Sequence, residues 1–278
     1  MNHKPPPQID PKNVSKSALN FDRLLRIMER LRDPEAGCPW DREQSHLTLR
    51  PLLLEETYEV FDAVDCGPKE LAGELGDVFS ILALFCQIGA DEKTFTAEDA
   101  LSAIIEKLIR RHPHVFGSAN ADGSEAVMKQ WEAIKQEERK GTREEGVLSG
   151  VPKSMPALAR AQRVSEKCAR VGFEWPTFDE IKDKVLEEVN EFVSAVSETP
   201  DDRERQADEF GDIFFSLVQL ARRSGFNAEE LLVGSTNKFI RRFQAIEALA
   251  KEHGNEDGVK GLSLEEMDAL WNEVKRKG

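Results

Sequence analysis

Cysteine is scarce in this sequence and is spread along it. The 278 residues contain four cysteines, none of them in a C-x-x-C pair: Cys38, Cys66, Cys86 and Cys168. This distribution excludes a disulfide framework and a cysteine-based zinc site, and it is typical of proteins from a reducing compartment. We therefore expect a cytoplasmic protein.

Basic residues are outnumbered by acidic ones. There are 38 lysines and arginines against 52 aspartates and glutamates, which gives a net charge of −14. Stable nucleic-acid binding needs a basic face, so we expect none here. An acidic protein can nevertheless bind a polyphosphate when divalent cations bridge the two.

Long apolar runs are also missing. The amino-terminal stretch MNHKPPPQIDPKN is polar and rich in proline, unlike the apolar core of a signal peptide. The longest apolar stretch, near residues 78–86, is too short to span a bilayer. We therefore expect no membrane segment. The chain can still build hydrophobic cores, because 40% of its residues are hydrophobic.

Helical periodicity is abundant from about Ala18 onward, whereas alternating strand patterns are scarce. The helical pattern occurs twice, in the same order and at nearly the same spacing. LEETYEVFDAV at 54–64 matches LEEVNEFVSAV at 186–196, and GELGDVFSILALF from Gly73 matches DEFGDIFFSLVQL from Asp208. EKLIRRH at 106–112 matches NKFIRRF at 237–243, and QWEAIKQE at 130–137 resembles LWNEVKRK at 270–277. We predict an all-α fold built as a tandem repeat of one helical domain.

The boundaries of the two repeats follow from composition. Residues 140–152, KGTREEGVLSGVP, are polar and contain three glycines, which is typical of a linker. We expect a disordered tail over residues 1–17, a first helical domain over 18–139 and a second over 153–278.

Acidic residues cluster on two successive predicted helices of each repeat. Spacings of three or four residues place them on shared helix faces, where like charges repel one another. The first-repeat cluster consists of Glu55, Glu56, Glu59, Glu74 and Asp77, and the second-repeat cluster of Glu187, Glu188, Glu191, Glu209 and Asp212. Repulsion of this kind would be relieved by a bound cation.

Apolar residues surround these carboxylates. The predicted helix from about Leu71 to Phe85 is apolar around most of its circumference, so we expect it to be buried. Carboxylates beside buried faces are costly unless they are paired or bind a metal. Oxygen ligands without histidine or cysteine nearby favour Mg²⁺, Mn²⁺ or Ca²⁺ over zinc, and the clusters therefore predict a metal site.

Each repeat places a basic stripe downstream of its carboxylates. The stripes are Lys107, Arg110 and Arg111 in the first repeat, and Lys238, Arg241 and Arg242 in the second. Such side chains are candidates for phosphate contacts, with surface salt bridges as the alternative. Trp131 and Trp271 are candidates for stacking on a base, although a single helical tryptophan is more often part of a core.

Together these residues resemble the MazG family of nucleoside triphosphate pyrophosphohydrolases, from about Ala18 to the end of the sequence. The family signature, E-E-x-x-E followed by E-x-x-D, is present in both carboxylate clusters. Three further strings resemble the two-repeat bacterial members of the family: CPWDREQ from Cys38, RRHPHVF from Arg110 and PALARAQRVSEKCARVGFEW from Pro156.

The resemblance implies Mg²⁺-dependent hydrolysis of NTPs and dNTPs to nucleoside monophosphate and pyrophosphate, with broad specificity and a role in nucleotide-pool housekeeping. It also implies a homodimer whose four-helix-bundle-like cores form across the interface. By motif position, the metal would be held by Glu188, Glu191, Glu209 and Asp212. Phosphates would be contacted by Lys238 and Arg242, with Arg205 as a further contact, and the base by Trp271. Glu187 is our candidate for the general base.

Two other classes of protein use similar residues. A di-iron carboxylate bundle needs a Glu-x-x-His pair on each of two helices, and Glu43 with His46 is the one such pair in the sequence. A non-catalytic nucleotide sensor would bind the same ligands without turnover. His112 and His114 resemble a metal-binding pair, but the intervening Pro113 ends a helix and favours a structural corner.

The surroundings of the two clusters differ. Four residues before E-x-x-D the second repeat has Arg205, whereas the first has Glu70. Pro113 ends the helix that carries Lys107, whereas the helix that carries Lys238 continues. We therefore expect the main catalytic site in the second repeat, with the first-repeat cluster as a possible second metal site.

Overall fold

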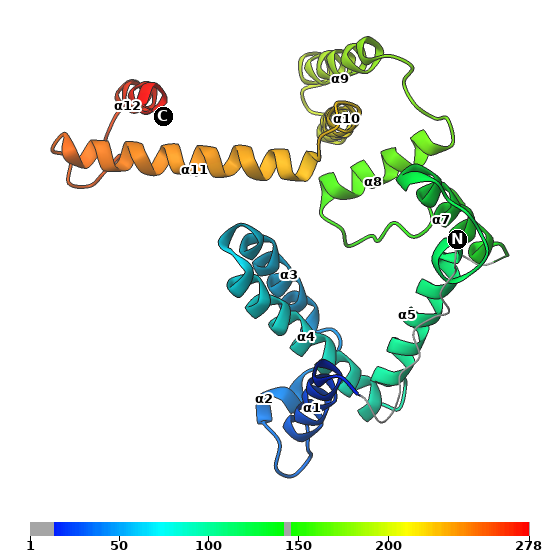
Figure 1. Ribbon diagram of the computed structural model, residues 1–278. Helices are drawn as coiled ribbons and strands as arrows, with labels where there is room; N and C mark the ends of the chain where they lie inside the picture. The colour runs from blue at the N-terminus through cyan, green and yellow to red at the C-terminus, as the bar shows by residue number, and fades with distance from the viewer. Residues whose placement is uncertain (1–13, 142–145, 278) are drawn as a thin grey trace. The chain divides into compact units, whose positions relative to one another are not determined.

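The computed structural model describes residues 14–141 and 146–277 (Figure 1). Within these ranges every regular element is a helix and none is a strand, which confirms the predicted all-α class. Residues 1–13 of the expected tail and 142–145 of the expected linker lie outside the described residues. The chain divides into two compact units, Met1–Glu138 and Arg139–Gly278.

The first unit is built from seven helices, and the last residue of the seventh lies just past the unit's boundary. They are α1 (Lys16–Leu31), α2 (Pro39–Glu43), α3 (Leu49–Cys66), α4 (Pro68–Asp91), α5 (Ala97–Arg111), α6 (Pro113–Phe116) and α7 (Gly123–Arg139). The second unit contains α8 (Ala157–Arg170), α9 (Phe178–Glu198), α10 (Arg203–Arg223), α11 (Ala228–Glu252) and α12 (Leu264–Lys277).

Local sequence explains where the main helices begin. Thr96 and Thr177 form capping boxes at the starts of α5 and α9, which satisfy backbone N–H groups that have no partner inside the helix. Gly67 joins α3 to α4 with a φ of +136°, a conformation that favours glycine, and Pro68 then starts α4. As predicted, α5 ends before Pro113 and α11 continues well beyond Lys238.

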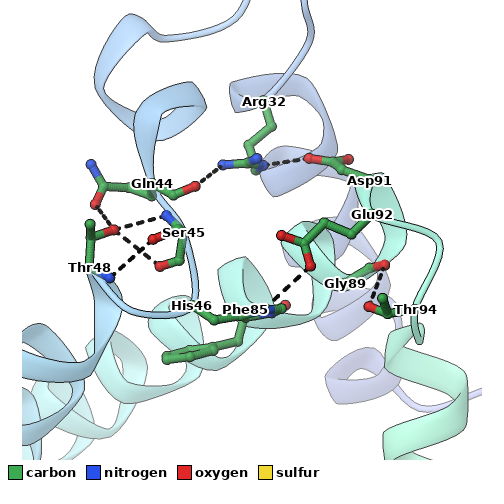
Figure 2. Close-up of polar contacts among 10 residues, drawn as sticks. All are labelled: Arg32, Gln44, Ser45, His46, Thr48, Phe85, Gly89, Asp91, Glu92 and Thr94. Carbon is green, nitrogen blue, oxygen red and sulfur yellow. Dashed lines mark hydrogen bonds and ion pairs between the residues drawn. The ribbon is translucent and has the colours of Figure 1, made fainter.

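The core of the first unit lies where α1 and the start of α3 meet α4. Its buried members are Met28, Leu49, Ala83, Leu84 and Ile88. Polar contacts between α4 and the segments beside it stabilise the region around this core (Figure 2). Arg32 Nε lies 2.6 Å from Asp91 Oδ2, and the same guanidinium donates to the carbonyl of Gln44 at 3.2 Å. These contacts bind the C-terminal end of α4 to the segment that precedes α3.

The prediction that the helix from about Leu71 to Phe85 is buried is wrong within a single chain. In α4, Leu75, Phe79 and Leu82 are 42%, 51% and 44% exposed. The reason is that α4 packs against α3, α1 and the start of α5, and these neighbours leave one apolar face uncovered. The hairpin of α9 and α10 repeats this pattern, with Leu186 and Phe214 exposed.

Helix α4 is also long and apolar enough to cross a membrane by length and composition, which residues 78–86 alone did not suggest. Helices from the interior of a soluble bundle pass the same test. Because α4 also carries Glu74 and Asp77 of the first carboxylate cluster, the test is a weak indication of a membrane span.

In the second unit, α9 and α10 pack side by side, with Ile181, Ala195 and Val218 buried. A separate cluster joins α11 to α12 through Ile246, Ala250 and Leu270. In the second unit the two helices with the carboxylates, α9 and α10, therefore form one pair. The helix with the basic stripe, α11, pairs with α12.

Replacing Ile88 by alanine should lower the free energy of unfolding by about 2–5 kcal/mol, because it removes apolar atoms from a side chain that is 1% exposed and leaves a cavity. Denaturant unfolding followed by circular dichroism measures the change. Leu47→Ala is the control, since Leu47 is 72% exposed, and it should shift stability by no more than about 0.5 kcal/mol. Equal losses in both variants would contradict this description of the core.

Candidate functional site

Three carboxylates of the second repeat converge between α9 and α10. Glu188 on α9 and Glu209 and Asp212 on α10 each offer an oxygen, and these three atoms lie within 4.8 Å of one another. Their convergence follows from the helix pair, because residues three apart on α10 share a face and that face is turned toward Glu188. Three of the four predicted metal ligands therefore lie together.

Glu188 is the buried member of this cluster, with 6% of its surface exposed. A buried carboxylate is costly without a partner, and Lys184 supplies one. Lys184 Nζ lies 2.8 Å from Glu188 Oε1 and 2.9 Å from Glu187 Oε1. The hydrogen bonds that Lys184 donates to the two carboxylates raise the pKa of its ammonium above the ordinary value, so this group stays charged at neutral pH.

Glu191, the fourth predicted ligand, lies one turn after Glu188 on α9. Partial desolvation raises the pKa of its carboxyl, and the negative charges of Glu188 and Glu209 act in the same direction while Lys184 opposes them. Glu191 thus belongs to the same electrostatic cluster. It also lines an open hollow of about 400 Å³ on α9, together with Glu187 and Asn190.

Arg205 adds a second cation at the edge of the cluster. Its Nε lies 3.8 Å from Glu209 Oε1, one turn apart on α10. The start of α10 is fixed by Asp202, whose side chain accepts from the backbone N–H of Arg205. The cluster can therefore bind a cation through its carboxylate oxygens, and it can bind an anion through Lys184 and Arg205.

The predicted phosphate and base contacts form another group, on α11 and α12. Lys238 and Arg242 lie one turn apart on α11, and neither side chain makes a hydrogen bond or ion pair within residues 14–141 and 146–277. Trp271 on α12 packs against Phe239, the neighbour of Lys238, with ring centroids 5.1 Å apart. In the described residues no hydrogen bond or ion pair joins this group to the carboxylates of α9 and α10.

The first repeat has a corresponding acidic cluster. Glu56, Glu59 and Glu74 each offer an oxygen within 4.8 Å of the others. Partial desolvation, followed by the negative charges of Glu59, Asp77, Glu74 and Glu55, raises the pKa of Glu56. Desolvation and the charge of Glu74 likewise raise the pKa of Glu59. The charges of the other four predicted carboxylates therefore all act on Glu56.

Lys184 is a site residue that the sequence analysis missed. The signal was available, because Lys184 precedes Glu188 by one helical turn and the (i, i+4) spacing brings the two charges together. Aligning LEEVNEF with LEETYEV places Leu52 at the corresponding position of the first repeat. The first cluster thus lacks the equivalents of both Lys184 and Arg205.

His46 and His112 make contacts of a structural kind. His46 Nε2 faces the carbonyl of Phe85 at 3.1 Å (Figure 2). The His46 ring also stacks on the rings of Phe85 and Phe95. His112 Nδ1 lies 2.6 Å from the carbonyl of Leu108, at the corner between α5 and α6. These contacts favour a structural role for His46 and a structural corner at His112 over a metal site.

Comparison with known proteins finds the MazG nucleotide pyrophosphohydrolase domain twice, at residues 44–116 and 177–246. Both carboxylate clusters, Arg205, Lys238 and Arg242 lie within these ranges, whereas Trp271 lies beyond the second.

Similar proteins cover almost the whole chain. The nucleoside triphosphate pyrophosphohydrolase of Escherichia coli K12 is 44% identical over 258 residues, which are 92% of this chain and 97% of that protein. The nucleoside triphosphate pyrophosphohydrolase/pyrophosphatase MazG of Thermotoga maritima is 38% identical over 263 residues, 94% of this chain and 98% of that protein. The uncharacterized protein YabN of Bacillus subtilis is 44% identical over 256 residues, 92% of this chain and 51% of that protein.

Two matched domains, together with relatives that align end to end, decide the family. The chain is a member of the MazG family of nucleotide pyrophosphohydrolases, and it contains the family's domain twice.

Proposed function

We propose that this protein hydrolyses nucleoside triphosphates to nucleoside monophosphate and pyrophosphate, with Mg²⁺, at the second repeat. The observation that carries the proposal is the convergence of Glu188, Glu209 and Asp212 within 4.8 Å beside the cations Lys184 and Arg205. The names of the Escherichia coli and Thermotoga maritima relatives support the same reaction.

The donor set fits magnesium. All three converging groups are carboxylates, and Mg²⁺ prefers a small number of carboxylate oxygens completed by water and substrate phosphates. Mn²⁺ accepts the same ligands and would substitute. When bound, the ion supplies positive charge that neutralises the triphosphate and activates water. Glu191 is the fourth proposed ligand, because it lies in the same electrostatic cluster.

The remaining roles fall to side chains around the carboxylates. Glu187 is exposed beside the cluster and paired with Lys184, a position from which it would accept the proton of the attacking water. Arg205, Lys238 and Arg242 would hold the phosphates, since they are cations that remain accessible on α10 and α11. Positioning and charge stabilisation would then provide most of the rate enhancement.

Broad specificity follows from how the base would be held. Trp271 lies against Phe239 as a partly buried side chain of the α11–α12 cluster, and its ring would stack on a nucleobase. Stacking on an aromatic ring accepts every base, because each base has a π-face. An enzyme of this kind would act on free nucleotides in the cytoplasm and serve in nucleotide-pool housekeeping.

A homodimer is part of the proposal. The exposed apolar side chains of α4 are matched by exposed side chains on α3, among them Tyr58 at 46% and Phe61 at 60%. On the second hairpin, Val193 is 57% and Phe214 49% exposed. Exposed apolar side chains that gather on a helix pair mark a surface that another chain usually covers. A second copy of the chain, which would complete each hairpin to a four-helix bundle, is the proposed cover.

The products test the reaction. With an NTP as substrate, chromatography should resolve nucleoside monophosphate and pyrophosphate, because hydrolysis of the bond between the α- and β-phosphates releases these two products. Chelation of divalent ions should abolish turnover, and added Mg²⁺ or Mn²⁺ should restore it. Nucleoside diphosphate and orthophosphate as products would refute the proposed cleavage, and binding of NTP without any turnover would favour a nucleotide sensor.

Matched variants test the division of labour between the repeats. Glu209→Gln and Asp212→Asn should lower kcat/KM about 10²–10³-fold, the scale on which loss of a preorganised electrostatic contact slows an enzyme. Glu74→Gln and Asp77→Asn, the corresponding changes in the first repeat, should leave most of the activity, because that cluster lacks the cations Lys184 and Arg205. Circular dichroism confirms folding of each variant. Equal losses in both repeats would disprove the assignment.

The mass in solution tests the homodimer. Light scattering at micromolar concentration should give twice the mass of the chain. Phe214→Glu should shift the population toward monomer, because it places a charge on the exposed apolar face of α10. Leu264→Glu is the matched control, since Leu264 is 79% exposed at the start of α12, and it should leave the mass unchanged. A monomeric mass for the parent chain would contradict the proposal.

A further inference from the structure

The basic stripe of the first repeat is occupied by a carboxylate of the same unit. Arg110 Nε lies 2.7 Å from Glu138 Oε1, and Arg111 Nη2 lies 2.5 Å from Glu138 Oε2. Arg111 Nε donates to the same Oε2 at 3.2 Å. Arg111 thus holds Glu138 through two nitrogens, which is the forked geometry that arginine uses to bind carboxylates and phosphates.

This contact is shielded from solvent. The side chain of Arg111 is 15% exposed and that of Glu138 is 22% exposed, so the pair is screened less than a surface salt bridge. The hydrogen bond from Arg111 is the main reason why the pKa of Glu138 falls to about 2. Glu138 is therefore ionised at any pH near neutrality.

Glu138 lies in the last turn of α7, where a carboxylate faces the negative end of the helix dipole. Arg110 and Arg111 lie in the last turn of α5, where cations are favoured. The acidic side chain is thus placed unfavourably within its own helix and is compensated by the two arginines. The pairing, and not local helix stability, accounts for its position.

The neighbouring Trp131 also contacts cations of the first unit. The Arg111 guanidinium lies 5.8 Å from the ring centroid of Trp131, and Lys135 Nζ lies 4.5 Å from it. The indole Nε1 is buried without a hydrogen-bond partner. Trp131 therefore packs against cations, in contrast to Trp271, which packs against Phe239.

The second repeat has the same arginines without the carboxylate. Aligning KFIRRF with KLIRRH pairs Arg242 with Arg111 and Lys238 with Lys107. The side chains of Lys238 and Arg242 make no ion pair or hydrogen bond in the described part of the chain. Counted from the two tryptophans, the position of Glu138 corresponds to Gly278, which has no side chain that could bind an arginine.

We propose that the first repeat contains a latent anion site for a triphosphate, and that Glu138 occupies it in the place of a substrate phosphate. The inference rests on the proposed function, because it treats Arg111 as the counterpart of the phosphate-binding Arg242. Glu138 neutralises the arginines that a triphosphate would need, and the first repeat is thereby closed to substrate by its own side chain.

Binding of inorganic tripolyphosphate tests this inference. The full chain carries Lys238→Ala and Arg242→Ala to silence the second repeat, and EDTA is present so that no metal contributes. In this background Glu138→Gln should bind tripolyphosphate at least about tenfold more tightly by titration calorimetry, a gain of about 1.4 kcal/mol. Glu125→Gln is the matched control, because it removes the same charge from α7 at an exposed pair with Lys129, and it should leave binding unchanged.

Two further variants make the result decisive. Adding Arg111→Ala to Glu138→Gln should abolish the gain, which locates the new binding at the arginines. Glu138→Asp keeps the charge but shortens the side chain, and it should give an intermediate gain if Glu138→Gln does not fold. A folded Glu138→Gln variant without tighter binding, or an equal gain from Glu125→Gln, would overturn the inference. Since no hydrolysis is measured, an error in the proposed reaction would not affect this outcome.

Discussion

Carboxylates that two packed helices hold within 4.8 Å repel one another, and this repulsion governs how each repeat is organised. In the second repeat the cost is offset by Lys184, which contacts both Glu187 and the buried Glu188, and by Arg205 at the edge of the cluster. In the first repeat no lysine or arginine takes these positions, and desolvation, followed by the charges of the neighbouring carboxylates, raises the pKa values of Glu56 and Glu59. A divalent cation would relieve it in either repeat.

The two repeats share the same carboxylates but differ in the cations around them. Leu52 and Glu70 stand in the first repeat where Lys184 and Arg205 stand in the second. The downstream arginines also leave the first repeat with fewer available cations. Arg111 is bound to Glu138, whereas the side chain of Arg242 has no partner in the described residues. A triphosphate carries several negative charges, so under the proposed function a site without available cations would still bind metal but would bind substrate poorly. Duplication thus left two similar acidic clusters with different electrostatic surroundings.

Much of the fold could be predicted because it depends on local patterns. The helices, the end of α5 before Pro113 and the convergence of the E-x-x-D residues follow from helical periodicity and from the chemistry of proline. Burial was harder to predict. The apolar circumference of α4 suggested a buried helix, yet Phe79 is half exposed because the unit supplies neighbours on one side of the helix. Composition shows that a surface needs a cover, but not which chain provides it.

The sequence by itself determined the family, the all-α class and the positions of the carboxylates, since each of these depends on residue types at fixed spacings along a helix. The tertiary structure decided which charges meet. That Glu138 meets Arg110 and Arg111 depends on how the last turn of α7 reaches the last turn of α5. That Trp131 packs against cations while Trp271 packs against Phe239 is likewise decided by tertiary contacts, in the second case by the packing of α12 against α11. Contacts between distant segments depend on packing and leave no periodic trace in the sequence, and they are what distinguishes the open cations of one repeat from the occupied cations of the other.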